Sequence, residues 1–356
     1  MHKSRVGFVW NDIILGYDYA NRNRGHSIRF QKTIDELRAS GFLQTPTVEI
    51  MKPEKLSLDL LKRIHSERYI NFVKNISDTG EGDIDIDTPG FKGIFDLSLS
   101  TSGALVSATR AIHRKEIIHS FCLTGGFHHA SYDRGGGFCV FNDIAAAVYD
   151  LQDKGYERIL VADFDVHHGN GTQKYFYDDP SVMHISFHED PEWMYPHDGY
   201  ISDIGAGSGK GFNINMPFPM DAGDSVYRFA FDEIVPPLLD YFQPEFIIFM
   251  PGSDAHYLDP LAHIMLTTET IHYVTERIHE AAHEICEGRL AVPSGGGYNQ
   301  LSYCRSICAV MSVLTEHPFQ LPDETPPFED DDEIWSIVES NVKQVKSLVY
   351  PELGIL

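Results

Sequence analysis

The sequence of 356 residues predicts an α/β fold with a mostly parallel sheet, and two observations support this. Six short runs are continuously apolar rather than alternating, which favours strands that are covered on both faces. Helical stretches separate most of these runs, as expected when crossover helices join parallel strands. The predicted strands are Val6–Trp10, Ile117–Leu123, Ile159–Asp163, Val182–Phe187, Phe246–Met250 and Leu290–Ser294.

The predicted helices are the segments in which apolar residues recur at helical spacing. Four are Asp143–Lys154, Ser225–Tyr241, Thr268–Cys286 and Leu301–Glu316, and the region from Met1 to about Glu81 is also expected to be mostly helical. The acidic run Pro322–Glu333 predicts a solvated loop, with Asp331–Glu333 at the start of a last helix. No repeat or long linker divides the chain, so we expect a single domain over residues 1–356.

The charge balance excludes some classes of partner. With 28 basic and 52 acidic side chains, the formal net charge is −24. Such a chain has no general positive field for nucleic acid or for an anionic membrane surface. The five cysteines form no CxxC pair, which argues against a disulfide framework and a four-thiolate zinc site. With no signal-peptide or membrane-span pattern, we expect a cytoplasmic protein, whose oligomeric state is left open.

Unusual polar clusters follow four of the predicted strands, where open α/β sheets bind their ligands. They lie at 124–130, 162–172, 250–256 and 293–299. The second is the most informative, because Asp163, Asp165 and His167 follow a period of two and an extended backbone would point them to one face. Three buried ionisable groups are costly unless they form a hydrogen-bond network or bind a metal, and we favour the metal.

Asp165 and His167 would supply two metal ligands, and Asp254 on a neighbouring strand end can supply the third. Three protein ligands with an open position are typical of catalytic zinc. Fe²⁺ or Co²⁺ fits the same ligands, because affinity alone does not choose the metal.

At these residues the sequence resembles the zinc-dependent histone deacetylase family, which includes acetoin-utilisation proteins and acetylpolyamine amidohydrolases. The motifs occur in the family's order and at its spacing: GGFHHA, GGGFCVFNDI, DFDVHHGNGTQ, DAHYLDPLAH and GGGYN. The resemblance implies the arginase/deacetylase fold, with an eight-stranded parallel sheet between helical layers. It also implies zinc-dependent removal of acetyl groups from acetyl-lysine or a similar amine.

The resemblance also assigns roles to single residues. The implied zinc ligands are Asp165, His167 and Asp254. The implied catalytic residues are the tandem histidines His128 and His129, Tyr298 as the group that polarises the acetyl carbonyl, Asp163 beside His128, and Asn170 opposite His129. A potassium ion is expected at Asp163, Asp165, His167, Ser186 and Phe187. The acyl-lysine tunnel is expected at Gly137, Phe138, Tyr195, Leu261 and Asp87.

Several alternatives stay open at this point. The substrate could be an acetylpolyamine or another small amide, although the apolar Leu261 favours an acyl-lysine stem. The pocket could bind an acyl-lysine without hydrolysing it, or the chain could be a scaffold. Asn170 resembles the class II pattern and Asn142–Asp143 the class I pattern, so the formal class is open. We expect His168 to be structural, and His256 to lie at the pocket rim or pack internally. The segment Tyr17–Arg29 keeps little of the family's rim signature.

Overall fold

A computed structural model describes residues 5–13 and 26–355, and the segment Tyr17–Arg29 lies largely outside these residues. Eight strands hydrogen-bond in the order β2-β1-β5-β10-β9-β6-β7-β8, and the paired registers are parallel. The predicted fold class is confirmed. The strands are β1 (Val6–Val9), β2 (Val48–Met51), β5 (His119–Cys122), β6 (Ile159–Asp163), β7 (Val182–Glu189), β8 (Asn213–Phe218), β9 (Phe246–Met250) and β10 (Leu290–Pro293), and a separate pair is β3 (Asp83–Asp85) with β4 (Thr88–Pro89).

All six predicted strands are present in the eight-stranded sheet, and the two strands of this sheet that the sequence did not predict are the edge strands β2 and β8. β2 is short and alternates Val48 and Ile50 with a glutamate, and Ile50 is exposed. β8 interrupts its apolar residues with Asn213 and Asn215, both of which are buried. An edge strand pairs on one side only, so its pattern is weaker than that of a central strand.

The contacts divide the chain into two compact units. The N-terminal unit contains Met1–Gly155, Asn170–Tyr175 and Ala291–Gly295, and the C-terminal unit contains Tyr156–Gly169, Phe176–Leu290 and Gly296–Leu356. A single domain over the whole chain therefore stays a prediction.

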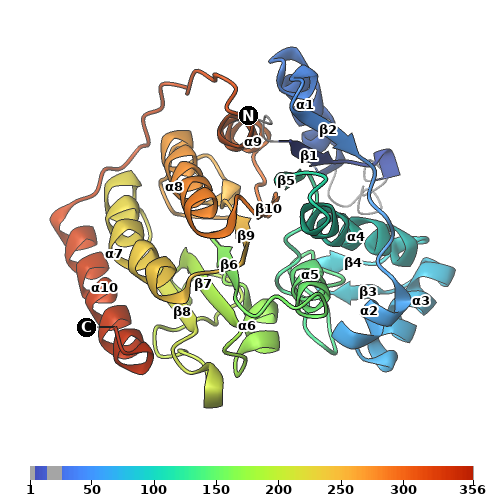
Figure 1. Cartoon of the computed structure of the whole chain (residues 1–356), viewed down its shortest axis with the longest axis horizontal. Coiled ribbons are helices and arrows are strands. Elements are labelled where there is room, and N and C mark those ends of the chain that lie inside the picture. The colour runs from blue at the N-terminus through green and yellow to red at the C-terminus, as the bar shows by residue number, and fades with distance from the viewer. Residues whose placement is uncertain (1–4, 14–25, 356) are drawn as a thin grey trace. The chain divides into compact units, whose positions relative to one another are not determined.

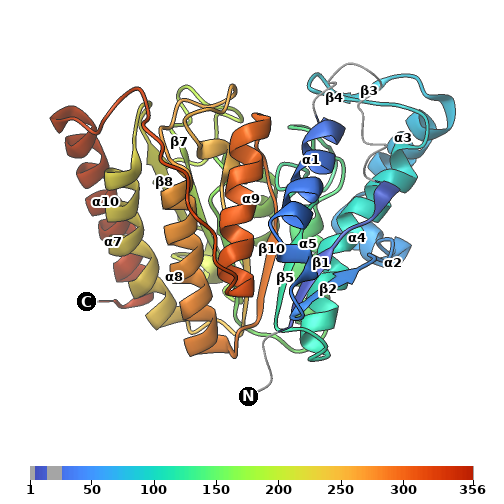
Figure 2. The ribbon, with the colours of Figure 1, turned by 90° about the horizontal axis from the view of Figure 1, so that it is seen from above.

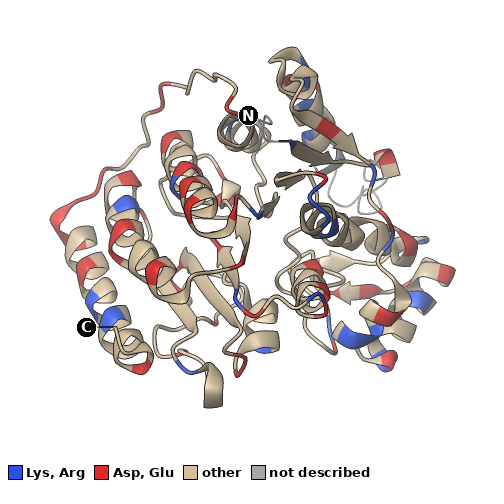
Figure 3. Cartoon of the chain, viewed as in Figure 1, with Lys and Arg blue, Asp and Glu red and all other residues tan. Residues whose placement is uncertain are grey.

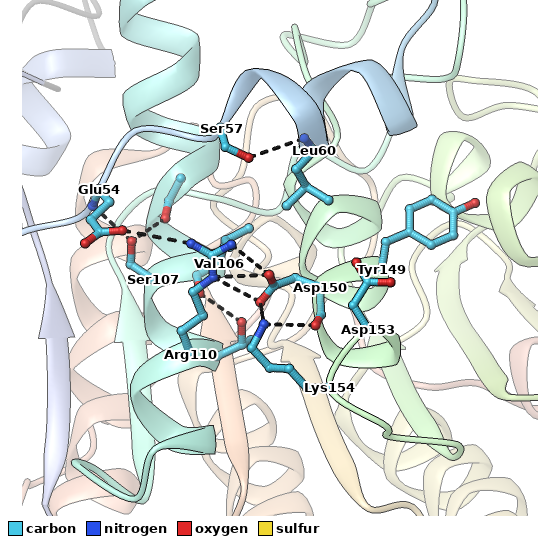
Figure 4. Close-up of polar contacts among 12 residues, drawn as sticks. Glu54, Ser57, Leu60, Val106, Ser107, Arg110, Tyr149, Asp150, Asp153 and Lys154 are labelled. Carbon is cyan, nitrogen blue, oxygen red and sulfur yellow. Dashed lines mark hydrogen bonds and ion pairs between the residues drawn. The ribbon is translucent and has the colours of Figure 1, made fainter.

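The N-terminal unit is organised around a long buried helix, α4 (Ile94–His113), which packs on β1 and β5 (Figure 1). Its Arg110 donates to Asp150 of α5 (Asp143–Gln152) at 2.7 Å, and Lys154 donates to the same carboxylate (Figure 4). These cations outweigh burial and lower the pKa of Asp150. The other helices of the unit are α1 (His26–Ala39), α2 (Leu58–Ile64), α3 (Glu67–Thr79), α5 (Asp143–Gln152) and α6 (Asn170–Phe176), with the short turn η2 (Phe42–Gln44).

The C-terminal unit contains the three remaining predicted helices and a last one: α7 (Asp224–Phe242), α8 (Thr268–Cys286), α9 (Gln300–Thr315) and α10 (Asp332–Leu353). In Figure 2 α8 lies between α7 and α9, and it packs on both helices and on β9. The short turns η3 (Gly207–Gly209) and η4 (Ser253–Ala255) also belong to this unit. An aromatic cluster lies in its core, in which Phe164 and Phe187 each meet the ring of Tyr227 edge to face.

The last helix begins where the acidic run predicted it. Asp331 caps α10, accepting hydrogen bonds from the backbone N–H groups of Glu333 and Ile334. Among the described residues no helix is long and apolar enough to span a membrane. None of the five cysteines forms a disulfide bond, and four of them are buried.

We expect Asp330→Ala to destabilise the protein, because Asp330 caps α7 from a distant part of the chain. Its carboxylate accepts from the N–H groups of Gly223, Ser225 and Val226 at 2.6, 3.0 and 3.2 Å. These first-turn donors have no partner within the helix. The expected loss is about 1–3 kcal/mol, measured by thermal denaturation. Glu329→Ala, at the exposed neighbouring position, should leave the midpoint unchanged; an equal fall in both variants would contradict the cap.

Candidate metal centre and catalytic residues

The three predicted metal ligands meet in the C-terminal unit. The parallel strands β6 and β9 bring Asp163 level with Met250, so the loops after both strands leave the sheet together. Asp165 and His167 lie on the first loop, and Asp254 lies in η4 on the second. His167 Nδ1 is 3.0 Å from Asp165 Oδ1 and 3.3 Å from Asp254 Oδ2.

The loop after β6 keeps backbone bonds to both neighbouring strands, because the N–H of Phe164 donates to the Met250 carbonyl at 3.0 Å and the Val166 carbonyl accepts from the N–H of Glu189 at 2.9 Å. An extended backbone as the reason for this convergence stays a prediction. The strand ends at Asp163, whose carboxylate accepts from the backbone N–H of Asp165 at 3.3 Å. The carboxylate of Asp165 accepts in the same way from the N–H of His167 at 3.1 Å. Side-chain bonds to the backbone two residues onward are turn-forming bonds of aspartate. They point Asp165 and His167 to one place, while Asp163 faces His184, with Oδ2 4.0 Å from Nε2.

The three side chains fit a divalent cation. Their ligand atoms lie within 4.8 Å of one another and all three residues are buried. Two ligand atoms on a tetrahedral zinc ion are separated by about 3.3 Å, close to the spacing here. Gly296 lies directly against both carboxylates. Its N–H donates to Asp165 Oδ2 at 2.8 Å, and a Cβ at this position would lie 2.1 Å from Asp254 Oδ2.

The electrostatics of these side chains show what a cation would balance. Burial and the charge of Asp165 raise the pKa of Asp254. Burial disfavours the charged form of His167, but its bonds to Asp165 and Asp254 outweigh this and raise its pKa. Two buried carboxylates thus compete for one positive charge. A metal ion would supply that charge and leave the imidazole neutral, as a ligand must be.

Tyr298 lies beside this cluster, with its ring centroid 6.3 Å from that of His167 and the rings perpendicular. Its backbone N–H donates to Asp259 Oδ2 at 2.6 Å, and Asp259 Oδ1 accepts from the N–H of Leu261 at 3.0 Å. Asp259 therefore fixes both the tyrosine and the loop that carries Leu261. No pattern in the sequence indicates this role of Asp259, because its partners are backbone groups with no residue signature.

The tandem histidines lie in the N-terminal unit together with Asn170. His129 Nδ1 is 3.0 Å from Asn170 Oδ1, and the Nε2 atoms of His128 and His129 are 3.1 Å apart. With the amide oxygen of Asn170 as acceptor, Nδ1 of His129 carries the proton and Nε2 is left as the basic atom. This orientation suits a group that takes up a proton at Nε2.

Asp143 supports the loop that carries His128 and His129, a role that the sequence did not predict. Its carboxylate accepts from the N–H groups of Gly126 at 3.0 Å and Phe127 at 2.7 Å. A Cβ at Gly125 would lie 2.6 Å from this carboxylate, which explains the glycine. Burial raises the pKa of Asp143 to about 6, although these N–H groups and the charge of His128 oppose it.

Asn142 secures the same loop from the other side. Its side-chain oxygen caps α5 by accepting from the N–H of Ala145, and its amide donates to the carbonyl of Ala130 at 2.9 Å. The Asn142 backbone N–H donates to His65 Nε2 at 3.2 Å. Burial lowers the pKa of His65 to about 4, so His65 is neutral and can accept.

The predicted tunnel residues fall in both units. In the N-terminal unit, Asp87 accepts from the N–H of Gly137 at 3.0 and 3.1 Å, and Thr88 accepts from the N–H of Phe138 at 2.9 Å. A Cβ at Gly137 would lie 2.2 Å from the His129 ring, so only glycine fits. In the C-terminal unit, the ring of Tyr195 is 6.4 Å from that of His167, and Leu261 is 43% exposed.

The remaining predicted residues are buried in the C-terminal unit. Ser186 pairs in register with Asp163, and its hydroxyl lies 2.9 Å from His188 Nδ1. Phe187 packs against Phe164 with ring centroids 4.8 Å apart. His168 packs against His188 at 4.8 Å. His256 packs internally: it is fully buried, and its Nε2 lies 3.2 Å from Glu324.

Comparison with known proteins gives consistent matches over most of the chain. A family model described as the histone deacetylase domain matches residues 24–314. A probable deacetylase of Archaeoglobus fulgidus is 35% identical over 295 residues, 83% of this chain and 81% of that protein. The acetoin utilization protein AcuC of Bacillus subtilis is 34% identical, over 70% of this chain and 67% of that protein.

Two further proteins, one compared by sequence and one by structure, also match most of the chain. A histone deacetylase-like amidohydrolase of Pseudomonas aeruginosa is 34% identical, over 72% of this chain and 68% of that protein. The crystal structure of the HDA15 HD domain superposes with a TM-score of 0.86 at 25% identity, covering 99% of this chain and 97% of that one.

We expect Ser253→Ala to stabilise the protein, because the hydroxyl of this fully buried serine has no hydrogen-bond partner among the described residues. An unpaired buried hydroxyl costs free energy that alanine does not, so the gain should be about 1 kcal/mol by thermal denaturation. Ser294→Ala is the matched control: its buried hydroxyl donates to the Leu123 carbonyl at 3.0 Å, and its loss should destabilise the protein. A loss of stability in Ser253→Ala would contradict the expectation.

Proposed function

The chain belongs to the histone deacetylase family, and on that premise we propose that it is a zinc-dependent amidohydrolase that removes acetyl groups from acetyl-lysine or a similar acylated amine. The observation that carries the proposal is the buried group of Asp165, His167 and Asp254, whose donor atoms suit zinc. Carboxylate and imidazole ligands without thiolates suit a catalytic rather than a structural zinc site.

Zinc, when bound by these residues, would polarise the acetyl carbonyl and make the attacking water more acidic. The residues of the chain would complete the hydrolysis. His129 would take the proton of the water at Nε2 and later pass it to the nitrogen of the leaving amine. Asn170, which holds the opposite nitrogen of His129, follows the predicted ligand His167 by only three residues along the chain.

Two other groups would stabilise charge during the reaction. The Tyr298 hydroxyl would donate a hydrogen bond to the oxyanion as the carbonyl is attacked. His128 would act electrostatically, and Asp143 beneath its loop favours a positive charge there. The role of Asp163 beside His128 stays a prediction from the resemblance.

The proposal includes a structural potassium ion at Asp163, Asp165, His167, Ser186 and Phe187. The register of β6 and β7, which sets Ser186 beside Asp163, supports this assignment, as does the burial of all five residues. For the substrate, the apolar and partly exposed Leu261 favours an acyl-lysine stem over a cationic polyamine.

A competition assay tests the function. We would load the protein with Zn²⁺, offer acetyl-lysine peptides and N-acetylated polyamines together, and follow loss of acetyl by mass spectrometry. Faster peptide turnover is expected, and both a chelator and Asp254→Ala should abolish it. Faster polyamine turnover would overturn the lysine-type substrate, whereas no turnover with zinc bound would overturn the deacetylase.

The tyrosine gives a separate prediction. Tyr298→Phe should retain zinc and substrate binding but lose about 10²–10³-fold in kcat, because the oxyanion loses one donor. The backbone N–H that bonds to Asp259 is unchanged in this variant, so the loop should keep its position. Tyr257→Phe, which removes a hydroxyl from a ring stacked on His256, is the control and should retain activity. Near-full activity of Tyr298→Phe would remove Tyr298 from the mechanism.

A further inference from the structure

A second cluster of metal-binding residue types lies in the C-terminal unit, outside the residues assigned above. α8 and the end of α9 line a groove of about 740 Å³. Six of its residues come from one face of α8, where they recur at helical spacing: His272, Glu276, His279, Glu280, His283 and Glu284. The other wall comes from the end of α9 and the segment after it, including Glu316 and His317. Figure 2 shows the two helices side by side.

His279 and His283 have the geometry of a chelating pair. They are four residues apart on one helix, with ring centroids 4.7 Å apart. Each offers a ring nitrogen, and these nitrogens lie within 4.8 Å of each other. Two nitrogens bound to one tetrahedral zinc ion are about 3.3 Å apart, which a small rotation of the exposed His283 can reach. The i, i+4 histidine spacing on a helix is a known arrangement for holding zinc.

Glutamates line the same groove as the pair. Glu276 and Glu280 lie three residues before His279 and His283 respectively, which places each on the neighbouring turn of the same face. Glu280 also forms an ion pair with Arg277 at 2.6 Å, and Glu276 is exposed. Figure 3 shows acidic residues along α8, so the groove favours a cation over an anion.

We infer that this groove is a second transition-metal site, in which His279 and His283 bind Zn²⁺ as a pair one helical turn apart. The ion would join two turns of α8 and stabilise the helix that packs on β9. The inference does not depend on the proposed deacetylase activity, because it uses none of the residues that the activity requires.

Zinc titration of the metal-stripped full-length protein tests the site. Wild type should bind about two ions per chain, Asp254→Ala one, and His283→Gln one. His283 is exposed, so the variant should fold normally, and the second ion should bind at least about tenfold more weakly. Co²⁺ in place of Zn²⁺ gives a visible absorption for each site, and the zinc-dependent rise in melting temperature should shrink in His283→Gln.

The controls separate the two sites and exclude non-specific binding. His113→Gln changes an exposed histidine of α4 and should leave two ions bound. If only the active-site proposal is wrong, wild type and Asp254→Ala bind the same single ion and His283→Gln loses it. The inference is overturned if His283→Gln and a double variant with His279→Gln bind as many ions, with the same affinity, as wild type. It is also overturned if His113→Gln weakens binding equally.

Discussion

The burial of two carboxylates and one imidazole at the ends of β6 and β9 is the constraint on which the candidate site depends. Charges removed from water must be paired, and Asp165, Asp254 and His167 share too few positive charges among themselves. Neighbouring residues support these side chains. The N–H of Val166 donates to Asp254 at 2.9 Å, and Gly296 leaves room for the carboxylates where a side chain would not fit. An arrangement that is costly for stability and yet so closely supported is typical of a functional site.

Several acidic residues also fix the position of loops and helix ends inside the protein. Asp87, Asp143, Asp259 and Asp330 each accept hydrogen bonds from backbone N–H groups of distant residues, and three of them hold loops that carry predicted site residues. A carboxylate can accept two such bonds at once, which fixes a loop more firmly than a single neutral acceptor can. Part of the excess of negative charge therefore positions the backbone and does not form a field that attracts substrates.

The sequence predicted the central strands and the site residues for the same reason: both leave a local pattern. Continuous apolar runs marked the six inner strands, and His, Asp and Gly clusters marked the strand ends. The edge strands β2 and β8 lacked such a run. Asp143 and Asp259 were missed as supports because their partners are backbone groups, which have no residue signature.

The sequence by itself determined the fold class, the residue types available for metal binding and the family motifs, because these depend on periodicity and on the order of residues along the chain. Only the tertiary structure decided which of these residues meet. It brought Asp254 to His167 across 87 residues, set Asn170 against His129, and directed His256 into the core rather than to a rim. Such contacts follow from strand register and packing between elements, which no local pattern of residues encodes.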